Sequence, residues 1–289
     1  MEHEPDPALS GRVAVVTGAN SGIGRVTAHE LAARGMRLFI TCRSRAKGEP
    51  VVEEIVERSG NPEVECLAME LGDFDSVRRC AEDFLARDLP LHLLVNNAGL
   101  GVQNGRTPSG FELAFGVNHL GPFLFTTLLL ERIVGSAPAR IVTVASVGHA
   151  NAKGIDFEAV CRKTASYYGS NEYYVSKLAN LLFSAELARR LAGTGVTTYS
   201  LHPGIVATNV WRRFRWPLDA IAKAFMMSEE DGARTTLYCA TSPEVEKQTG
   251  LYYDSCAVKE PSALARDPAL ARELWERSEE WVGYRHSFD

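Results

Sequence analysis

A glycine-rich turn between a predicted strand and a predicted helix constrains the fold of this chain more than any other feature of its sequence. Residues 12–17 form an apolar, β-branched run that is typical of a buried strand, and residues 26–34 have helical spacing. The glycines between them follow the pattern G-x-x-x-G-x-G. Such a turn favours phosphate binding over an ordinary strand-to-helix turn, because glycines allow a close backbone approach and the helix N-terminus offers free N–H groups. The candidate residues for binding a dinucleotide are Gly18, Asn20, Ser21, Gly22, Ile23 and Gly24.

Strand and helix patterns alternate along the rest of the chain. Such alternation predicts a mostly parallel sheet with helices on both faces, since parallel neighbours need crossover connections. We therefore expect one α/β domain of the doubly wound Rossmann type over residues 1–289, with about seven strands. The further strands are expected at 37–42, 64–71, 91–95, 140–145, 197–201 and 249–253. The further helices are expected at 51–59, 76–87, 110–131, 177–190, 228–239 and 268–281.

The residues after the second predicted strand indicate which dinucleotide is bound. An acidic side chain there would hydrogen-bond a free ribose 2′-hydroxyl, whereas a basic one would pair with a 2′-phosphate. Arg43 stands at this position, no carboxylate follows before Glu49, and Arg25 adds a second cation after the glycine turn. A bidentate arginine–phosphate contact is strong and specific. The pattern therefore favours NADP(H) over NAD(H), with a solvated basic turn as the alternative.

Polar and small residues follow the carboxyl ends of two later strands, where ligand sites of α/β proteins form. Asn97, Ala98 and Gly99 come after the fourth predicted strand, and Ser146 follows the fifth. Small residues after the fourth strand would let a ribose lie against the backbone. A simple turn would have the same composition, so the interpretation depends on the neighbouring motifs.

Tyr173 and Lys177 are four residues apart where the predicted helix 177–190 begins, and in a helix residues at this spacing share one face. A nearby ammonium favours the ionised phenol and lowers its pKa from about 10. Tyr173 would then serve as a proton donor and acceptor near neutral pH. Tyr174 lacks the four-residue spacing. An ordinary core helix with a solvated face is the alternative for the isolated pair.

Composition excludes several other classes of protein. A net charge of −5 and a pI of about 5.9 lack the excess of positive charge that is typical of nucleic-acid-binding proteins. Residues 1–10 lack the basic and apolar regions of a signal peptide, and we expect no membrane span, because the longest apolar run is too short. The six cysteines are far apart without a C-x-x-C pair, which argues against a disulfide framework and a metal site. Free thiols are typical of a reducing cytosol, so we expect a cytoplasmic protein.

Residues 209–228 lack clean periodicity but carry many large apolar side chains. We interpret this segment as a cover over a lipophilic substrate, with a helical excursion packed on the core as the alternative. Residues 259–289 are expected to form a polar C-terminal tail that contains the last helix. The large apolar side chains of the proposed cover are Trp211, Phe214, Trp216, Phe225, Met226 and Met227.

In this order and on these elements, the motifs resemble those of the short-chain dehydrogenase/reductase superfamily over about residues 11–258. Further short runs resemble the retinol dehydrogenase branch of that superfamily. The superfamily motifs are Thr17-Gly18-x-x-x-Gly22-x-Gly24, Asn96-Asn97-Ala98-Gly99, Asn118, Ser146, Tyr173-x-x-x-Lys177 and Pro203-Gly204. The branch motifs are Cys42-Arg43, Asn118-His119-Leu120-Gly121-Pro122-Phe123 and Ser176-Lys177-Leu178-Ala179-Asn180.

The resemblance implies a catalytic tetrad of Asn118, Ser146, Tyr173 and Lys177. In reduction, Tyr173 would donate a proton to the carbonyl oxygen that Ser146 holds. Lys177 would lower the Tyr173 pKa and hold the nicotinamide ribose, and Asn118 would position a water that relays protons to Lys177. The resemblance also extends the cofactor-binding set to Tyr173, Lys177, Glu70, Leu71, Pro203, Gly204, Val206 and Thr208.

Two departures from the family pattern stand out. The family usually places aspartate before the apolar residue that follows the third strand, whereas this chain has Glu70 before Leu71. The side-chain contact to adenine would change, although the Leu71 amide remains available. Many animal retinol dehydrogenases also carry an N-terminal membrane anchor, which the polar residues 1–10 do not resemble.

The resemblance implies an NADP(H)-dependent oxidoreductase. It would transfer a hydride between nicotinamide and a lipophilic aldehyde or ketone, or the matching alcohol. Retinal-like aldehydes are one candidate class, and steroid or xenobiotic carbonyls are the alternative. A non-catalytic NADP-binding regulatory protein is the alternative of another class, and the complete tetrad argues against it. A homodimer or homotetramer is an expectation from the family alone.

Overall fold

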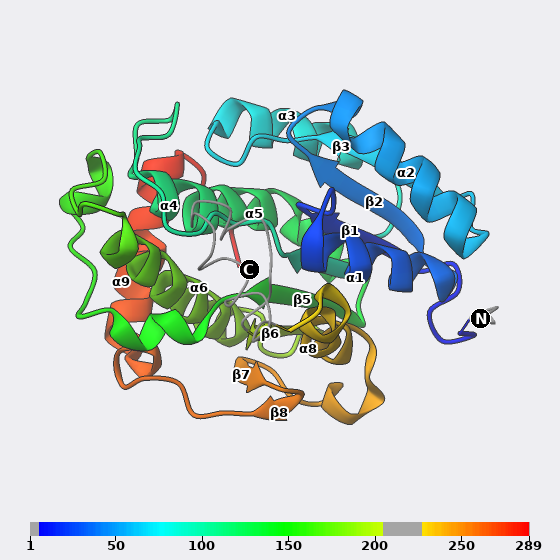
Figure 1. The fold of residues 1–289 in the computed structure, drawn as a ribbon. Helices are drawn as coiled ribbons and strands as arrows, with labels where there is room; N and C mark the ends of the chain where they lie inside the picture. Colours follow the sequence, from blue (N-terminus) through cyan, green and yellow to red (C-terminus); the bar gives the residue numbers. More distant parts are fainter. Residues whose placement is uncertain (1–5, 205–226, 289) are drawn as a thin grey trace.

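One eight-stranded sheet runs through the molecule in the computed structural model, which describes residues 6–204 and 227–288 (Figure 1). Its strand order is β3-β2-β1-β4-β5-β6-β7-β8, and every neighbouring pair is parallel except β7 and β8. The expected doubly wound sheet is confirmed, and the two-residue β8 is the strand that the sequence did not predict. The strands are β1 (Val13–Thr17), β2 (Arg37–Cys42), β3 (Val64–Ala68), β4 (Leu93–Asn96), β5 (Ala139–Val144), β6 (Val196–His202), β7 (Leu251–Asp254) and β8 (Ala257–Val258).

Helices cover both faces of this sheet. On one face α1 contacts α2 and α8, and on the other α3 contacts α5 while α6 contacts α9. Two separate clusters of buried apolar side chains fill the space between these layers and the sheet, so each face has its own core. The helices are α1 (Gly22–Ala33), α2 (Arg45–Ser59), α3 (Phe74–Leu85), α4 (Leu113–Phe115), α5 (Gly121–Val134), α6 (Ser170–Arg190), α8 (Glu229–Thr241) and α9 (Pro268–Val282).

The second helix begins earlier than predicted. It was expected from residue 51, but α2 begins at Arg45 and contains Pro50. Gly48 is buried, and a Cβ at this position would lie 2.0 Å from Sγ of Cys66 on β3. Glycine is therefore required for close packing of the helix on the sheet, and it does not mark a turn.

The helix predicted at 110–131 is divided into three parts. After α4 the chain widens into a π-helical turn, η1 (Gly116–Leu120), before α5 begins. In the described part of the chain, the stretch Leu113–Val134 is the one long and apolar enough to cross a membrane, yet 89% of its most apolar window is buried inside the protein. It serves here as a core helix.

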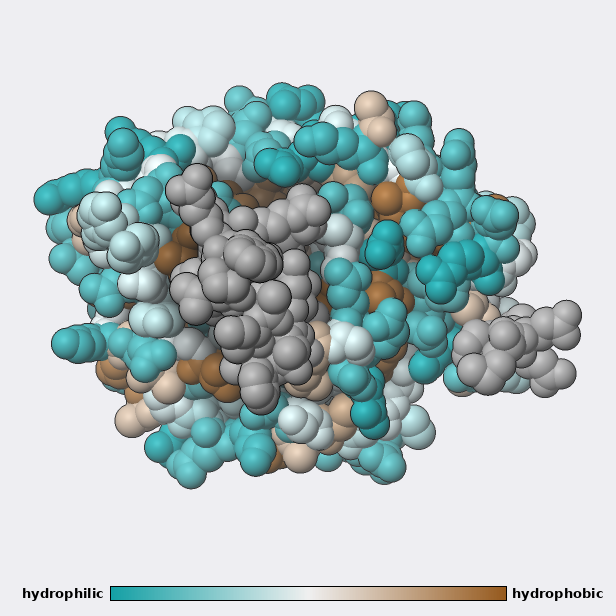
Figure 2. Space-filling view, viewed as in Figure 1, coloured by the Kyte–Doolittle hydropathy of each residue, from teal (hydrophilic) through white to brown (hydrophobic). Residues whose placement is uncertain are grey.

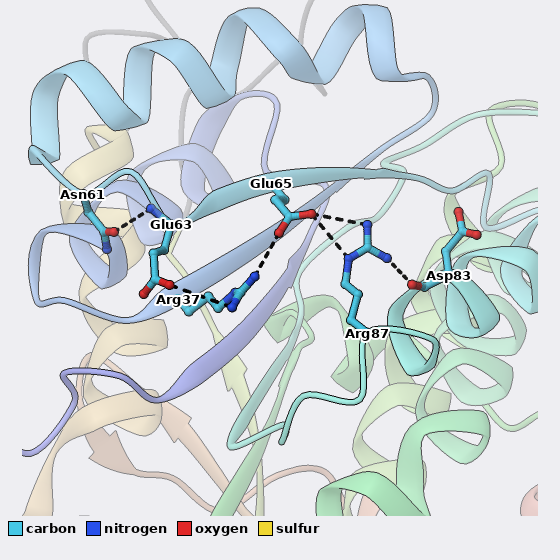
Figure 3. A network of polar contacts seen from close by, with 6 residues as sticks. All are labelled: Arg37, Asn61, Glu63, Glu65, Asp83 and Arg87. Carbon is cyan, nitrogen blue, oxygen red and sulfur yellow. Dashed lines mark hydrogen bonds and ion pairs between the residues drawn. The ribbon is translucent and has the colours of Figure 1, made fainter.

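A charged network covers one edge of the sheet (Figure 3). Glu65 on the edge strand β3 pairs with Arg37 of β2 and with Arg87, which follows α3, at 3.3 Å in each case. The guanidinium groups of Arg37 and Arg87 also lie over the Phe39 ring, 5.8 and 5.4 Å from its centroid. Charges on an edge strand hinder pairing with a strand of another chain.

Candidate active site

The glycine turn has the close backbone approach that the sequence predicted. Gly18 has φ +66°, and a Cβ there would lie 2.8 Å from Cα of Ala98. At Gly24, in the first turn of α1, a Cβ would lie 2.3 Å from Nδ2 of Asn97. The turn therefore packs directly on the loop after β4, and the N-terminal N–H groups of α1 begin at the same place. A narrow cradle of backbone at a helix N-terminus fits a dinucleotide pyrophosphate.

The hydroxyl of Thr17 connects the two loops. It accepts hydrogen bonds from the backbone amides of Asn97 and Ala98, both at 3.0 Å, and lies 3.3 Å from the carbonyl of Val95. The side chain of Asn97 donates in return to the Thr17 carbonyl at 2.8 Å. The loops after β1 and β4 are therefore held as one surface at the carboxyl edge of the sheet.

The two candidate cations for the 2′-phosphate differ in their surroundings. Arg25 pairs with Glu54 of α2 at 3.5 Å and with Glu229 of α8 at 3.7 Å. Arg43 is exposed after β2, and within the described ranges 6–204 and 227–288 no carboxylate pairs with it. Arg43 is therefore the better placed of the two for an incoming phosphate.

The loop after β3 contains the unusual Glu70. Its carboxylate accepts a hydrogen bond from the Gly72 amide at 3.4 Å, and its own amide donates to the Ser76 hydroxyl at 3.0 Å. Leu71 is buried where its carbonyl packs against Gly121, at the start of α5. The glutamate side chain is therefore folded back onto its own loop.

The end of β6 carries Pro203 and Gly204. Gly204 has φ +91°, and a Cβ there would lie 2.4 Å from Sδ of Met227. Val206, Thr208 and most of the predicted cover at 209–228 lie outside the described residues, which resume at Met227.

Ser146 and Tyr173 come together although they belong to different elements. Ser146 lies just beyond β5, where its Oγ accepts a hydrogen bond from the Gly148 amide at 3.1 Å. Tyr173 lies in the first turn of α6, close enough to Ser146 for the Ser146 hydroxyl to favour the ionised phenol and lower its pKa. The two hydroxyl groups can therefore hold one substrate oxygen between them.

Lys177 lies one turn further along α6, buried beneath Tyr173. Its Nζ donates to the Val144 carbonyl at 3.1 Å and lies 5.8 Å from the centroid of the Tyr173 ring. Burial lowers the Lys177 pKa to about 8. Burial also raises the Tyr173 pKa, and the Ser146 hydrogen bond only partly opposes this. The expectation that Lys177 lowers the Tyr173 pKa is therefore wrong for this arrangement, because burial outweighs any effect of the ammonium.

Asn118 faces this group from the π-helical turn η1. Its Nδ2 donates to the Leu100 carbonyl at 3.0 Å and to the Ser176 hydroxyl at 2.9 Å, while its Oδ1 accepts from the Leu100 amide. A Cβ added to Gly99 would lie 3.2 Å from Oδ1 of Asn118 and 3.5 Å from Nζ of Lys177. The structure thus brings together all four residues of the predicted tetrad.

Three supporting residues were not predicted as parts of the site. Ser176 donates to the Tyr173 carbonyl at 2.7 Å and accepts from Asn118, so it links two tetrad residues. Asn180 shares the Val144 carbonyl with Lys177, at 3.3 Å. His149 contacts the Ser146 carbonyl at 2.7 Å. Polar residues on the apolar face of a helix were the available signal for Ser176 and Asn180, and no local pattern marked His149.

Large exposed apolar or aromatic side chains gather in segments next to the site. On the face of the molecule that Figure 2 shows, hydrophobic residues interrupt the hydrophilic surface. Val147 follows Ser146, Val102 follows the loop after β4, and Met227 adjoins Gly204. Tyr167 and Tyr168 are 84% and 70% exposed in the loop before α6.

Comparisons with known proteins agree with this geometry. The family model described as short chain dehydrogenase matches residues 12–217. Retinol dehydrogenase 11 of Mus musculus is 43% identical over 95% of this chain and 87% of its own length. Retinol dehydrogenase 12 of Homo sapiens is 44% identical over 96% and 88%. A crystal structure of an uncharacterized protein from Mycobacterium paratuberculosis superposes with a TM-score of 0.77 at 32% identity, covering 98% of this chain and 97% of the other.

A second solved structure contains a nicotinamide cofactor. It is a 3-ketoacyl-(acyl-carrier-protein) reductase from Brucella melitensis complexed with NADH. It superposes with a TM-score of 0.64 at 25% identity, covering 85% of this chain and 97% of the other.

Proposed function

Because the chain belongs to the short-chain dehydrogenase/reductase family, on its retinol dehydrogenase-like branch, we propose that it is an NADP(H)-dependent oxidoreductase of lipophilic carbonyl compounds. The substrate would be an apolar aldehyde or ketone, or the matching alcohol. The observation that carries this proposal is the convergence of Asn118, Ser146, Tyr173 and Lys177 beside a glycine turn that fits a dinucleotide. A non-catalytic NADP-binding protein would not need this complete set.

Each tetrad residue has a role that its contacts support. When bound, the nicotinamide cofactor supplies or accepts the hydride. In the reductive direction, Tyr173 donates a proton to the developing alkoxide, and Ser146 holds the same oxygen by a hydrogen bond. The buried ammonium of Lys177 offers a further proton from behind Tyr173. Asn118 holds the Leu100 backbone and Ser176, which keeps the lysine side of the site in place.

The preference for NADP(H) rests on Arg43. This guanidinium follows β2, next to the edge where the glycine turn opens, and it is exposed. A guanidinium forms strong charge-assisted hydrogen bonds with a phosphate. Arg25 lies in reach of the same region but already has two carboxylate neighbours. We therefore assign the main contact with the 2′-phosphate to Arg43.

The apolar substrate class rests on the exposed side chains beside the site. Val102, Val147 and Met227 keep 38%, 44% and 42% of their surface exposed. Exposed apolar residues that cluster beside a pocket are typical of binding surfaces for apolar ligands. Retinol dehydrogenases 11 and 12 are named for a lipophilic alcohol, which supports a retinoid-like substrate. Steroid or xenobiotic carbonyls remain the alternative, because apolar pockets discriminate weakly between similar shapes.

A substrate panel tests the proposal. NADPH oxidation is followed with retinal, a medium-chain aldehyde, a steroid ketone and a short polar aldehyde as control. We expect turnover with at least one lipophilic carbonyl and a clearly lower kcat/KM for the polar control. Tight NADPH binding without turnover of any carbonyl, or of any matching alcohol with NADP, would favour the regulatory alternative.

A further inference from the structure

Behind the catalytic serine lies a histidine whose two ring nitrogens both have backbone partners. His149 belongs to the 3-10 turn η2 (Val147–Asn151) that follows Ser146, and only 4% of its surface is exposed. Its Nδ1 lies 2.7 Å from the carbonyl oxygen of Ser146. Its Nε2 accepts a hydrogen bond from the Ser262 amide at 3.1 Å. The His149 side chain therefore bridges the catalytic loop and the chain after β8.

These two partners determine the tautomer of the ring. A backbone amide can only donate, so Nε2 must be the unprotonated acceptor. A backbone carbonyl can only accept, so Nδ1 must carry the proton. His149 is therefore neutral, with its proton on Nδ1, whenever both contacts are present. Protonation of Nε2 would place two donors face to face and break the contact with Ser262.

The same histidine is held by packing on its other side. Its ring meets the Tyr252 ring of β7 edge-on, with centroids 5.2 Å apart. His202, at the end of β6, is the other titratable group in electrostatic contact with it, and Lys177 acts in turn on His202. Burial lowers the pKa of both His149 and His202, while burial raises that of Tyr252. Asp254, at the end of β7, raises the pKa of His202, whereas the causes of the His149 shift are burial, which lowers its pKa, and the Ser146 contact, which opposes this.

We propose that His149 is a positioning residue for the reaction: as the neutral Nδ1–H tautomer it ties the Ser146 backbone to Ser262 and so fixes the orientation of the Ser146 hydroxyl. The hydroxyl has a second constraint, because its oxygen accepts from the Gly148 amide in the same turn. The O–H and the remaining lone pair of Ser146 are thereby directed towards Tyr173. In Figure 1 the chain after β8 runs back along the α6 side of the sheet towards α9, which brings Ser262 to this place.

The inference rests on the proposed function, because Ser146 is taken as the group that holds the substrate oxygen. It predicts that kcat declines as the pH is lowered. Burial lowers the His149 pKa, so the neutral form persists down to that lowered value and is lost as the pH falls through it. Alignment of Ser146, and with it kcat, should therefore decline at a pH below the ordinary histidine value of about 6.5.

Two histidine variants separate positioning from simple packing. In His149→Asn the side-chain amide can place a donor near the former Nδ1 position but cannot titrate. In His149→Phe the ring shape remains and both hydrogen bonds are lost. We expect His149→Phe to lose about tenfold in kcat with little change in the KM for NADPH, as for a small misplacement of a catalytic group. We expect His149→Asn to recover most of this loss and to lack the acid decline of the wild type.

Two variants of Ser262 test the second contact without changing the histidine. Ser262→Pro removes the amide donor, whereas Ser262→Ala keeps it and serves as the matched control. We expect a severalfold loss of kcat in the proline variant only. Equal kcat in the wild type and His149→Phe, or equal losses in the two Ser262 variants, would overturn the inference.

A measurement without turnover separates this inference from the proposed function. Nitrogen-15 NMR of the imidazole reports which ring nitrogen carries the proton. We expect Nδ1–H at pH 7 and loss of the Ser262 contact on acidification. An Nε2–H tautomer overturns the inference even in an active enzyme. Conversely, absence of turnover with every carbonyl and alcohol in the panel refutes the proposed function, and the tautomer then still decides whether His149 bridges Ser146 and Ser262.

Discussion

The ammonium of Lys177 donates to the backbone carbonyl of Val144, 3.1 Å away, at the carboxyl end of β5. This contact anchors the lysine to the strand that leads to Ser146. Within the described residues no carboxylate is paired with Lys177, which has only 5% of its surface exposed. Its charge therefore faces the Val144 carbonyl dipole and the Tyr173 ring, and the free energy of burying that charge is unfavourable.

Replacement of Lys177 should separate stability from activity. Burial lowers its pKa from 10.5 to about 8, so between these values the unfolded chain holds more protons and the folding stability should rise with pH. Below pH 8 the buried charge opposes folding, by up to roughly 3 kcal/mol. We expect Lys177→Met to unfold at the same temperature as the wild type or higher at pH 7, while kcat falls by about hundredfold or more. Thermal melts from pH 7 to 10 and NADPH oxidation measure both; a clearly lower melting temperature at pH 7 would contradict this account.

The two adjacent tyrosines should respond differently to loss of the hydroxyl group. The Tyr173 phenol lies next to the Ser146 hydroxyl, which acts on its pKa, whereas the Tyr174 ring packs against Gly148. We expect Tyr173→Phe to lose about a hundredfold or more in kcat with NADPH binding retained, because the proton donor is removed. Tyr174→Phe keeps the packing ring and should stay within about twofold of the wild type, since it removes no proton donor of the reaction. Wild-type turnover in Tyr173→Phe would refute the assignment of the proton donor.

Arg43 should control the choice between the two dinucleotides. Removal of a charged hydrogen bond to phosphate typically costs about 1.5–3 kcal/mol, which is about tenfold to a hundredfold in affinity. We expect Arg43→Ala to weaken NADPH binding by this factor and to leave NADH binding nearly unchanged. Lys47→Ala, in the first turn of α2 four residues after Arg43, is the matched control for general loss of positive charge. Titration of both dinucleotides by fluorescence measures the ratio, and an unchanged ratio in Arg43→Ala would remove the arginine from the phosphate site.

Gly24 should tolerate no side chain. A Cβ there would lie 2.3 Å from Nδ2 of Asn97 and 2.7 Å from the Gly18 carbonyl, so the loops after β1 and β4 would have to separate. We expect Gly24→Ala to lose about 1–3 kcal/mol in the free energy of unfolding, together with most of its dinucleotide affinity. Gly135→Ala is the control, because a Cβ at that position has its nearest contact at 3.4 Å. Equal stability of the two variants in urea titrations would show that the loops can adapt.

The sequence predicted the fold because strands and helices follow local patterns. The Tyr173–Lys177 pair followed from its spacing, whereas the complete tetrad with Asn118 and Ser146 followed from the resemblance to the family. Apolar runs of five or six residues followed by helical spacing mark strands and helices without knowledge of the tertiary structure. The start of α2 was misplaced because Gly48 is required by its close packing against Cys66 of β3. This is a tertiary contact that a local sequence pattern does not show. The direction of the Tyr173 pKa shift failed for a related reason: spacing shows that Lys177 is near, but burial depends on the whole fold. The bridging position of His149 could not be predicted, because its Nε2 accepts from the amide of Ser262, 113 positions along the chain.

The π-helical turn at Asn118 has a consequence for how this chain tolerates changes in length. Such a turn holds one residue more than an ordinary α-helical turn, so it is equivalent to a single-residue insertion in a continuous helix. Deleting one residue, such as Val117, would restore a straight helix but rotate everything before or after it by about 100°. Either Asn118 would leave Leu100 and Ser176, or the buried side chains of α5 would turn away from the core. Chain length is therefore as strictly specified here as residue identity.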